Sequence, residues 1–185
     1  MSLSPIAAQP NAGAEPIWAD VLADGSRVLV RPVTRLDADA ERDFILGLSP
    51  RSMRNRFMGR IARPSDAFIA QLTDVDAAHD VALAAVVMEG ALEKFVGVAR
   101  YAVGPDPDTC DFAIVVADAW QNRGLGTRLM QHLIELARRH GVTRMVSVDL
   151  AENVEMRELA RDLGFACRVD PDDAHQVVYS RRLDG

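Results

Sequence analysis

The sequence is poor in cysteine and has no long apolar run. Cys110 and Cys167 are its two cysteines, and they do not form a Cys-x-x-Cys pair. Its four histidines are scattered, without the spacing of metal ligands. No apolar segment approaches the roughly 18 residues that span a bilayer, and the first 30 residues lack a basic segment followed by an apolar one. We therefore expect a cytoplasmic protein without a metal, a signal peptide or a membrane anchor.

Positive charge is in the minority, because the net charge is −6 and the pI is about 5.2. Binding to nucleic acid requires a basic surface, so that class of partner is excluded. A chain of 185 residues with 49% hydrophobic residues is sufficient for one domain with an ordinary core. We expect residues 1–16, rich in Ala, Pro and Gly, to be a disordered lead, and residues 17–185 to form that domain.

Hydrophobic periodicity predicts a mixture of strands and helices. A turn at Asp24-Gly25 precedes the first strand, and Pro32 should place that strand at a sheet edge or end it. The predicted strands cover residues 27–33, 81–88, 95–103, 110–116, 145–150, 165–169 and 176–181. The predicted helices cover residues 37–48, 49–58, 64–72, 125–140 and 153–163, with Gly141 and Gly164 ending the last two.

The most informative stretch is a strand that leads through a glycine-containing turn into an amphipathic helix. Gly124 and Gly126 lie at the start of that helix, where the first N–H groups have no partner inside it. Such a helix start is a binding site for an anion, most simply a phosphate. The apolar helix residues repeat at about four positions and are Leu125, Leu129, Met130, Leu133, Ile134 and Ala137.

Three interpretations compete for this turn. The glycines could merely allow close helix–sheet packing. A Rossmann dinucleotide site is suggested by Asp149 after the following strand, but its third glycine would fall at Leu129. A Walker loop is excluded because no Gly-Lys-Ser or Gly-Lys-Thr follows. The third interpretation is a resemblance to a known family.

Gln121-x-x-Gly124-x-Gly126, Asn153-x-x-Met156 and Leu163-Gly164-Phe165 together resemble the acetyl-CoA-binding core of the GNAT N-acetyltransferase superfamily. The similarity extends over nearly the whole chain from Asp24. It implies an α/β fold of mixed α+β type. The expected sheet is central and mostly antiparallel, with about six to seven strands and a V-shaped splay, flanked by about four to five helices. It also implies an acetyl-CoA-dependent N-acetyltransferase in which the acceptor amine attacks the thioester directly.

Further segments are similar to the GNAT domain of bacterial protein lysine acetyltransferases. These segments are Leu29-Val30-Arg31-Pro32, Leu48-Ser49, Arg56-Phe57, Ala82-Leu83, Gly97-Val98-Ala99-Arg100-Tyr101 and Trp120-Gln121. This resemblance implies a protein lysine as the preferred acceptor. A small-molecule amine, or a non-catalytic module that senses acyl-CoA, are the alternatives. GNAT domains often pair, so a homodimer is a further possibility for this chain.

The resemblance also implies which residues bind the donor. The pyrophosphate would lie on backbone N–H groups of the turn, and the pantetheine arm would pair with the strand like an added β-strand. These residues are Ile114, Val115, Val116, Gln121, Asn122, Arg123, Gly124, Leu125, Gly126 and Thr127. The Arg123 side chain would either add a phosphate contact or be solvated. Asn153 would contact CoA, although an N-cap role alone would also explain it.

Catalysis requires a neutral amine, and a free lysine has a pKa near 10.4, so a general base is expected. Asp111 occupies the position where the protein-acetylating relatives commonly carry glutamate, and an exposed structural acid is the alternative. His79 is the second candidate. Ala160 stands where many GNAT enzymes have a tyrosine acid, so no general acid is carried over. Neither cysteine has an activating neighbour, which argues against an acyl-enzyme.

Overall fold

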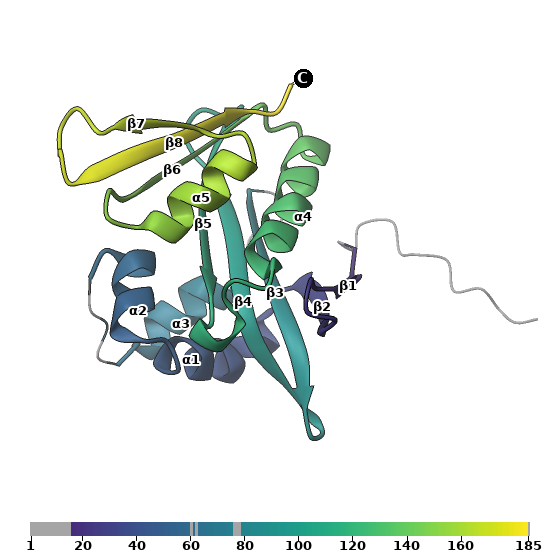
Figure 1. Cartoon of the computed structure of the whole chain (residues 1–185). Helices are drawn as coiled ribbons and strands as arrows, with labels where there is room; N and C mark the ends of the chain where they lie inside the picture. The colour runs from purple at the N-terminus through teal and green to yellow at the C-terminus, as the bar shows by residue number, and fades with distance from the viewer. Residues whose placement is uncertain (1–15, 60, 62, 76–78, 185) are drawn as a thin grey trace, which may run out of the picture.

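The computed structural model describes residues 16–59, 61, 63–75 and 79–184. Nearly all of the expected disordered lead lies outside these residues. Within the described ranges, eight strands form one sheet in the order β1-β2-β3-β4-β5-β6-β8-β7 (Figure 1). The strands are β1 (Trp18–Val21), β2 (Arg27–Pro32), β3 (Asp80–Glu89), β4 (Leu92–Val103), β5 (Thr109–Val116), β6 (Arg144–Leu150), β7 (Ala166–Val169) and β8 (Gln176–Arg182).

The mostly antiparallel sheet is confirmed, since every neighbouring pair except β5 and β6 is antiparallel. The sheet has one strand more than expected because β1 pairs with β2 through the turn that contains Gly25, whose φ is +83°. β1 has only four residues and borders the sheet on one side, so its sequence carries little periodic signal. Pro32 is the last residue of β2, as predicted.

Five α-helices flank the sheet in the described ranges, with short 3₁₀ turns before α1 and after β5. They are α1 (Ala38–Leu46), α2 (Pro50–Phe57), α3 (Asp66–Thr73), α4 (Leu125–Arg139) and α5 (Val154–Asp162). The third predicted helix begins two residues later than expected, because the Ser65 side chain accepts a hydrogen bond from Phe68 N and caps it there. None of the helices in the described residues has the length and apolarity needed to cross a bilayer.

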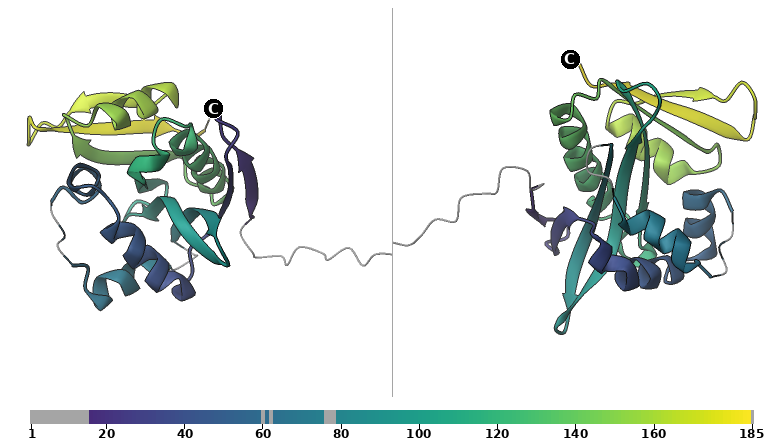
Figure 2. Two further views of the ribbon diagram at one scale, coloured as in Figure 1. Left: turned by 60° about the horizontal axis from the view of Figure 1, so that its bottom comes forward. Right: turned by 180° about the vertical axis from the view of Figure 1, so that it is seen from behind.

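The helices cover both faces of the sheet (Figures 1 and 2). α4 buries its predicted apolar row in one core, together with Met156 and Ala160 of α5. A second core holds α1, α2 and α3 against the opposite face. α4 approaches the sheet closely at Gly97, where an added Cβ would lie 2.9 Å from Leu129 Cδ1. The close helix–sheet contact therefore depends on Gly97.

The two parallel strands separate, which confirms the expected splay. β5 and β6 pair only at Thr109, Cys110 and Asp111 of β5. Beyond Asp111, β5 continues to Val116 and β6 continues to Leu150 without pairing to each other. The sheet is therefore open between these strands at their carboxyl ends, and α2 contacts both strands beside the opening.

Candidate active site

The turn after β5 aims the start of α4 at this opening. Asn122 and Gly124 both adopt left-handed backbone conformations, with φ of +59° and +84°. Gly124 occupies the N-cap position and supplies no side chain, so no side chain of the described residues caps α4. The first-turn N–H groups have no partner within the helix and carry the positive end of its dipole. This geometry suits a phosphate.

Close packing does not explain the two glycines of this turn. A Cβ added at Gly124 would meet no atom within 4 Å, so Gly124 is required by its positive φ and not by a neighbour. A Cβ added at Gly126 would lie 3.5 Å from Leu159 Cδ2, which is an ordinary contact. Gly126 therefore leaves space beside the turn that a larger side chain would fill.

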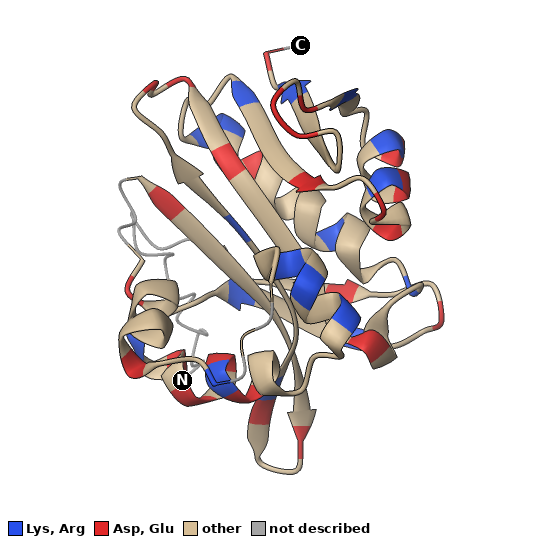
Figure 3. Cartoon of the chain, turned by 90° about the vertical axis from the view of Figure 1, so that its left-hand side faces the viewer, with Lys and Arg blue, Asp and Glu red and all other residues tan. Residues whose placement is uncertain are grey.

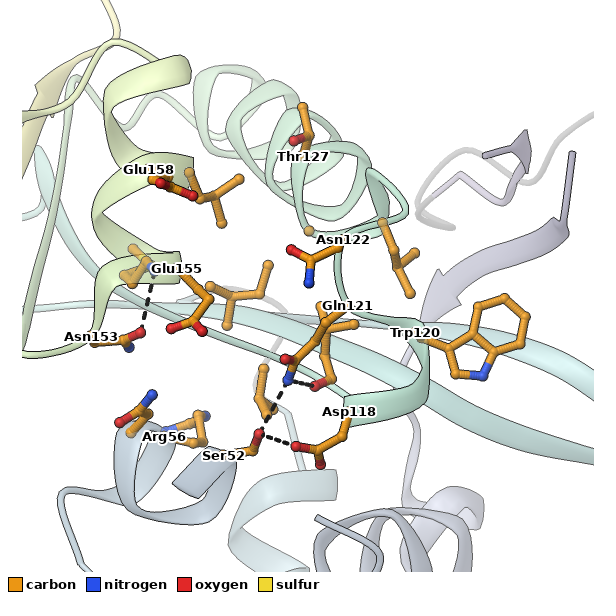
Figure 4. A pocket seen from close by; sticks show the side chains of 18 of the residues that line it. Ser52, Arg56, Asp118, Trp120, Gln121, Asn122, Thr127, Asn153, Glu155 and Glu158 are labelled. Carbon is orange, nitrogen blue, oxygen red and sulfur yellow. Dashed lines mark hydrogen bonds between the residues drawn. The ribbon is translucent and has the colours of Figure 1, made fainter. Parts of the chain in front are cut away.

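A pocket of about 440 Å³ extends from this turn through the splay. It is lined on one side by α2 and on the other by α4 and α5 (Figure 4). The structure brings most of the expected donor-binding residues together around it, namely Ile114, Val115, Val116, Gln121, Asn122, Gly124, Leu125, Gly126, Thr127 and Asn153. The pocket therefore runs without interruption from the turn, whose geometry suits a phosphate, to β5.

The side chain of Arg123 is the exception. Its guanidinium donates a hydrogen bond to Asp24 Oδ2 at 3.0 Å and stacks over the Trp120 ring, with 5.0 Å between Cζ and the ring centroid. The side chain is therefore not simply solvated, and its contact with a phosphate stays a prediction. Arg123 instead joins the turn to the loop between β1 and β2.

The two base candidates do not line the pocket. Asp111 is exposed on β5 at the last position that pairs with β6, so it lies at the closed end of the splay. It shares a sheet face with Val115, which does line the pocket. His79 is exposed just before β3, and its carbonyl accepts a hydrogen bond from Val103 N at 2.9 Å. His79 is thus separated from β5 by β4.

Asn153 is the N-cap of α5, because its Oδ1 accepts a hydrogen bond from Met156 N at 3.3 Å. Its Nδ2 donates to Asp149 Oδ2 at 2.9 Å, and Asp149 Oδ1 accepts from Leu150 N at 2.6 Å. Burial raises the pKa of Asp149 above its ordinary value. Both oxygens of Asp149 are engaged inside the protein, so the ribose-binding role that a Rossmann site would require is contradicted.

A hydrogen-bond network that the sequence did not reveal fixes α2 to the turn. Asp118 accepts hydrogen bonds from Ser49 N at 2.9 Å, from Ser49 Oγ at 2.6 Å and from Ser52 Oγ at 2.8 Å. Gln121 Nε2 donates to Ser52 Oγ at 3.1 Å and to Val116 O at 3.0 Å. The side-chain amide of Gln121 therefore joins α2 to the end of β5, and only the backbone of Gln121 is left to bind the donor.

Ion pairs connect α2 to α5 and to the loop just before it. Arg51 Nη2 lies 2.6 Å from Glu155 Oε1, and Arg54 Nη1 lies 2.8 Å from Glu152 Oε1. Both pairs are largely exposed, so each contributes little to stability. They nevertheless bring the two helices together on either side of the opening. Arg56, two residues after Arg54 on α2, also lines the pocket.

Comparison with known proteins agrees with this geometry. A model of the family described as Acetyltransferase (GNAT) family matches residues 51–165. An acetyltransferase of Pseudomonas aeruginosa is 43% identical over 166 residues, which cover 90% of this chain and 89% of that protein. The acetyltransferase Pat of Mycolicibacterium smegmatis is 30% identical over 141 residues, which cover 76% of this chain and 41% of that protein. The solved GNAT domain of S. lividans PAT has 27% identity and a TM-score of 0.82, over 90% of this chain and 96% of that one.

Proposed function

Because the chain belongs to the GNAT family of acetyltransferases, we propose that it transfers an acetyl group from acetyl-CoA to the side-chain amine of a protein lysine. The use of acetyl-CoA as the acyl donor follows from membership of the family. The protein lysine is the finer step, and two likenesses support it, to the acetyltransferase Pat and to the GNAT domain of PAT. The segments that resemble bacterial protein lysine acetyltransferases support the same acceptor.

The observation that carries the proposal is the continuity of the pocket from the start of α4 to the edge of β5. The N–H groups of residues 121–127 would hold the pyrophosphate, with Gly126 leaving space for it. The edge of β5 at residues 114–116 does not pair with β6 and offers backbone groups to the pantetheine arm, next to Val116 O, which accepts a hydrogen bond from Gln121 Nε2. Asn153 orients the start of α5 beside that arm.

In the proposed reaction the neutral amine attacks the thioester carbon, and the carbon–sulfur bond then breaks to release CoA as a thiolate. A general base takes the proton of the amine. An acyl-enzyme route has no support in the geometry. Burial, followed by the charge of Asp111, raises the pKa of Cys110 to about 12, and Cys167 lies on β7 outside the pocket. Direct transfer is therefore the route that the residues favour.

The alternatives are a small-molecule amine as acceptor and a module that binds acyl-CoA without turnover. Ala160 is buried at the position where a tyrosine acid would stand, which favours the second alternative. Release of free thiol separates these possibilities. An enzyme liberates CoA when given a protein or an amine acceptor, whereas a sensor binds CoA and liberates none.

Isothermal titration with acetyl-CoA, and in parallel with NADH, tests the site. We expect heat with acetyl-CoA and none with NADH. Gly126→Trp should weaken the binding of acetyl-CoA by at least about tenfold, which is about 1.4 kcal/mol, because the indole fills the pocket. Gly126→Ala is the matched control, since its Cβ makes only an ordinary contact, and its affinity should stay within about threefold of the parent.

Thermal unfolding of both variants verifies that they are folded. A folded Gly126→Trp protein that binds acetyl-CoA as tightly as the parent would refute the site. Equal heat with NADH would instead support a dinucleotide-binding site at this turn.

A further inference from the structure

Arg56 is a cation at the pocket that forms no ion pair with any residue that the structure describes. Arg51 and Arg54 form ion pairs with acids of the α5 region, but Arg56 does not. Among the residues that the structure describes, the guanidinium of Arg56 makes no hydrogen bond and no ion pair. Its one aromatic contact is with the neighbouring Phe57, with 4.8 Å between Cζ and the ring centroid. Arg56 is half-buried and lines the pocket.

Leaving this group unpaired is costly. A guanidinium has five N–H donors, and a half-buried cation without a partner loses part of its hydration with nothing to replace it. Burial, followed by the positive charge of Arg100, lowers the pKa of Arg56 to about 10, so the side chain is still a cation at neutral pH. An arriving anion would therefore find a charged donor that is already partly desolvated.

The acids near Arg56 are engaged elsewhere. Glu41 pairs with Arg100, with 3.3 Å between Oε1 and Nη2. Asp149 binds Asn153 and the backbone, and burial raises the pKa of both acids above their ordinary values. Glu155 pairs with Arg51. Glu41 and Asp149 act on Arg56 through their charge and not through a hydrogen bond, although Glu41 Oε2 is buried without a hydrogen-bond partner in the described residues. The N–H donors of Arg56 are therefore available to a ligand.

The position of Arg56 indicates which part of a ligand it would reach. In Figure 4, Arg56 lies on α2 across the cavity from Asn122 and Thr127, which belong to the phosphate end. A donor with its phosphates at the turn and its arm along β5 would carry its acyl group toward the other end of the cavity. Arg56 therefore faces the place where the acyl group and the acceptor amine meet.

We propose that Arg56 binds a carboxylate of the substrate at the acyl end of the pocket. This inference rests on the proposed function. A planar guanidinium matches a carboxylate with two parallel hydrogen bonds. The carboxylate has two sources, an acyl group that ends in one, such as succinyl, or an acidic residue beside the acceptor lysine. In either case the protein selects a substrate with an anion near the reacting carbon.

The donor arm of the test titrates the protein with succinyl-CoA and with acetyl-CoA. If the acyl group supplies the carboxylate, Arg56→Met should weaken the binding of succinyl-CoA by at least about tenfold and change that of acetyl-CoA by less than about twofold. Arg56→Lys keeps the positive charge but loses the two parallel N–H donors of the guanidinium. Its affinity for succinyl-CoA should lie between that of the parent and that of Arg56→Met. Arg63→Met, at an exposed arginine in the loop after α2, is the matched control and should leave both affinities unchanged.

The acceptor arm uses acetyl-CoA with two lysine peptides that differ only at the residue beside the lysine, which is glutamate in one and glutamine in the other. If the acceptor supplies the carboxylate, Arg56→Met should lower kcat/KM for the glutamate peptide by at least about tenfold and leave that for the glutamine peptide within about twofold. A selective loss in either arm supports the inference and identifies the source.

Equal effects within both pairs of ligands, in a variant shown to be folded, overturn the inference. If Arg56→Met does not fold, the same contrasts are read from Arg56→Lys. Failure of the proposed function gives a different result, because the parent protein would then bind no acyl-CoA. If only the inference about Arg56 is wrong, the parent protein still binds acetyl-CoA.

Discussion

The side chain of Asp111 is one methylene shorter than the glutamate that the protein-acetylating relatives commonly carry at this position, and this limits how Asp111 can act as a base. Asp111 lies four residues along β5 from Val115, a distance of about 13 Å, so it reaches an amine only from the closed end of the splay. We expect Asp111→Asn to lower kcat by roughly 10²–10⁴-fold, because the base must accept a proton from the amine. Asp111→Glu should retain activity. The measurement is kcat/KM as a function of pH, in which a working base makes the rate rise as it loses its proton.

His79→Ala is the comparison for this prediction. If Asp111 is the base, this variant should retain the rate of the parent, because β4 separates His79 from β5. An unchanged pH–rate profile in Asp111→Asn would exclude Asp111. Loss of activity in His79→Ala would move the role to that residue.

Residues whose roles are local could be predicted from sequence. Gly124 and Asn153 sit at helix starts, and a helix start is encoded by a few adjacent residues. The side chain of Arg123 could not be placed, because its partner Asp24 is 99 residues away. The same holds for Ser52, which meets Gln121 across 69 residues. Contacts of this kind depend on the sheet order, which no local pattern specifies.

At the scale of the element, α2 illustrates how a short helix is held in place. Its start was predictable from Ser49-Pro50, since Ser49 accepts a hydrogen bond from Ser52 N and proline suits the first helical position. Its docking was not predictable, because Asp118 supplies that contact from beyond β5. Asp118 thus positions the helix that carries Arg56 into the pocket.

We expect this docking to depend on pH. Desolvation acts to raise the pKa of Asp118, but hydrogen bonds from Ser49 and Ser52 together outweigh it and hold that pKa below its ordinary value. A lowered pKa means that the stabilisation is present above the unfolded-state pKa of about 3.9 and is lost as the pH falls through the folded-state pKa. At pH 7, Asp118→Asn should therefore lower the melting temperature, by about 3–6 °C for a loss of about 1–2 kcal/mol.

The difference between Asp118→Asn and the parent should narrow as the pH is lowered from 5 toward 3, as followed by thermal unfolding. Asp43→Asn, at an exposed carboxylate of α1, is the matched control and should track the parent throughout. A difference that stays constant with pH would contradict a role for the ionised carboxylate.

At the scale of the whole molecule, charge is distributed without a dominant sign on the face that Figure 3 shows, where blue and red segments are interspersed. The net charge of −6 is therefore a poor guide to the site, which combines backbone dipoles at α4 with arginines of α2. Composition correctly predicted an ordinary core, but the position of the splay follows from how the parallel pair β5 and β6 is flanked by antiparallel neighbours.

The opening between β5 and β6 has a consequence for kinetic order. The pocket is lined by Ser52 and Arg56 from one face of the sheet and by Gly126 and Leu159 from the other. If the donor and the acceptor enter from opposite faces, both would be bound at once, and neither would have to leave before the other arrives. Initial rates measured against both substrates should give double-reciprocal lines that intersect. Parallel lines would indicate a stored acyl group, and a covalent carrier residue would then have to be sought outside this pocket.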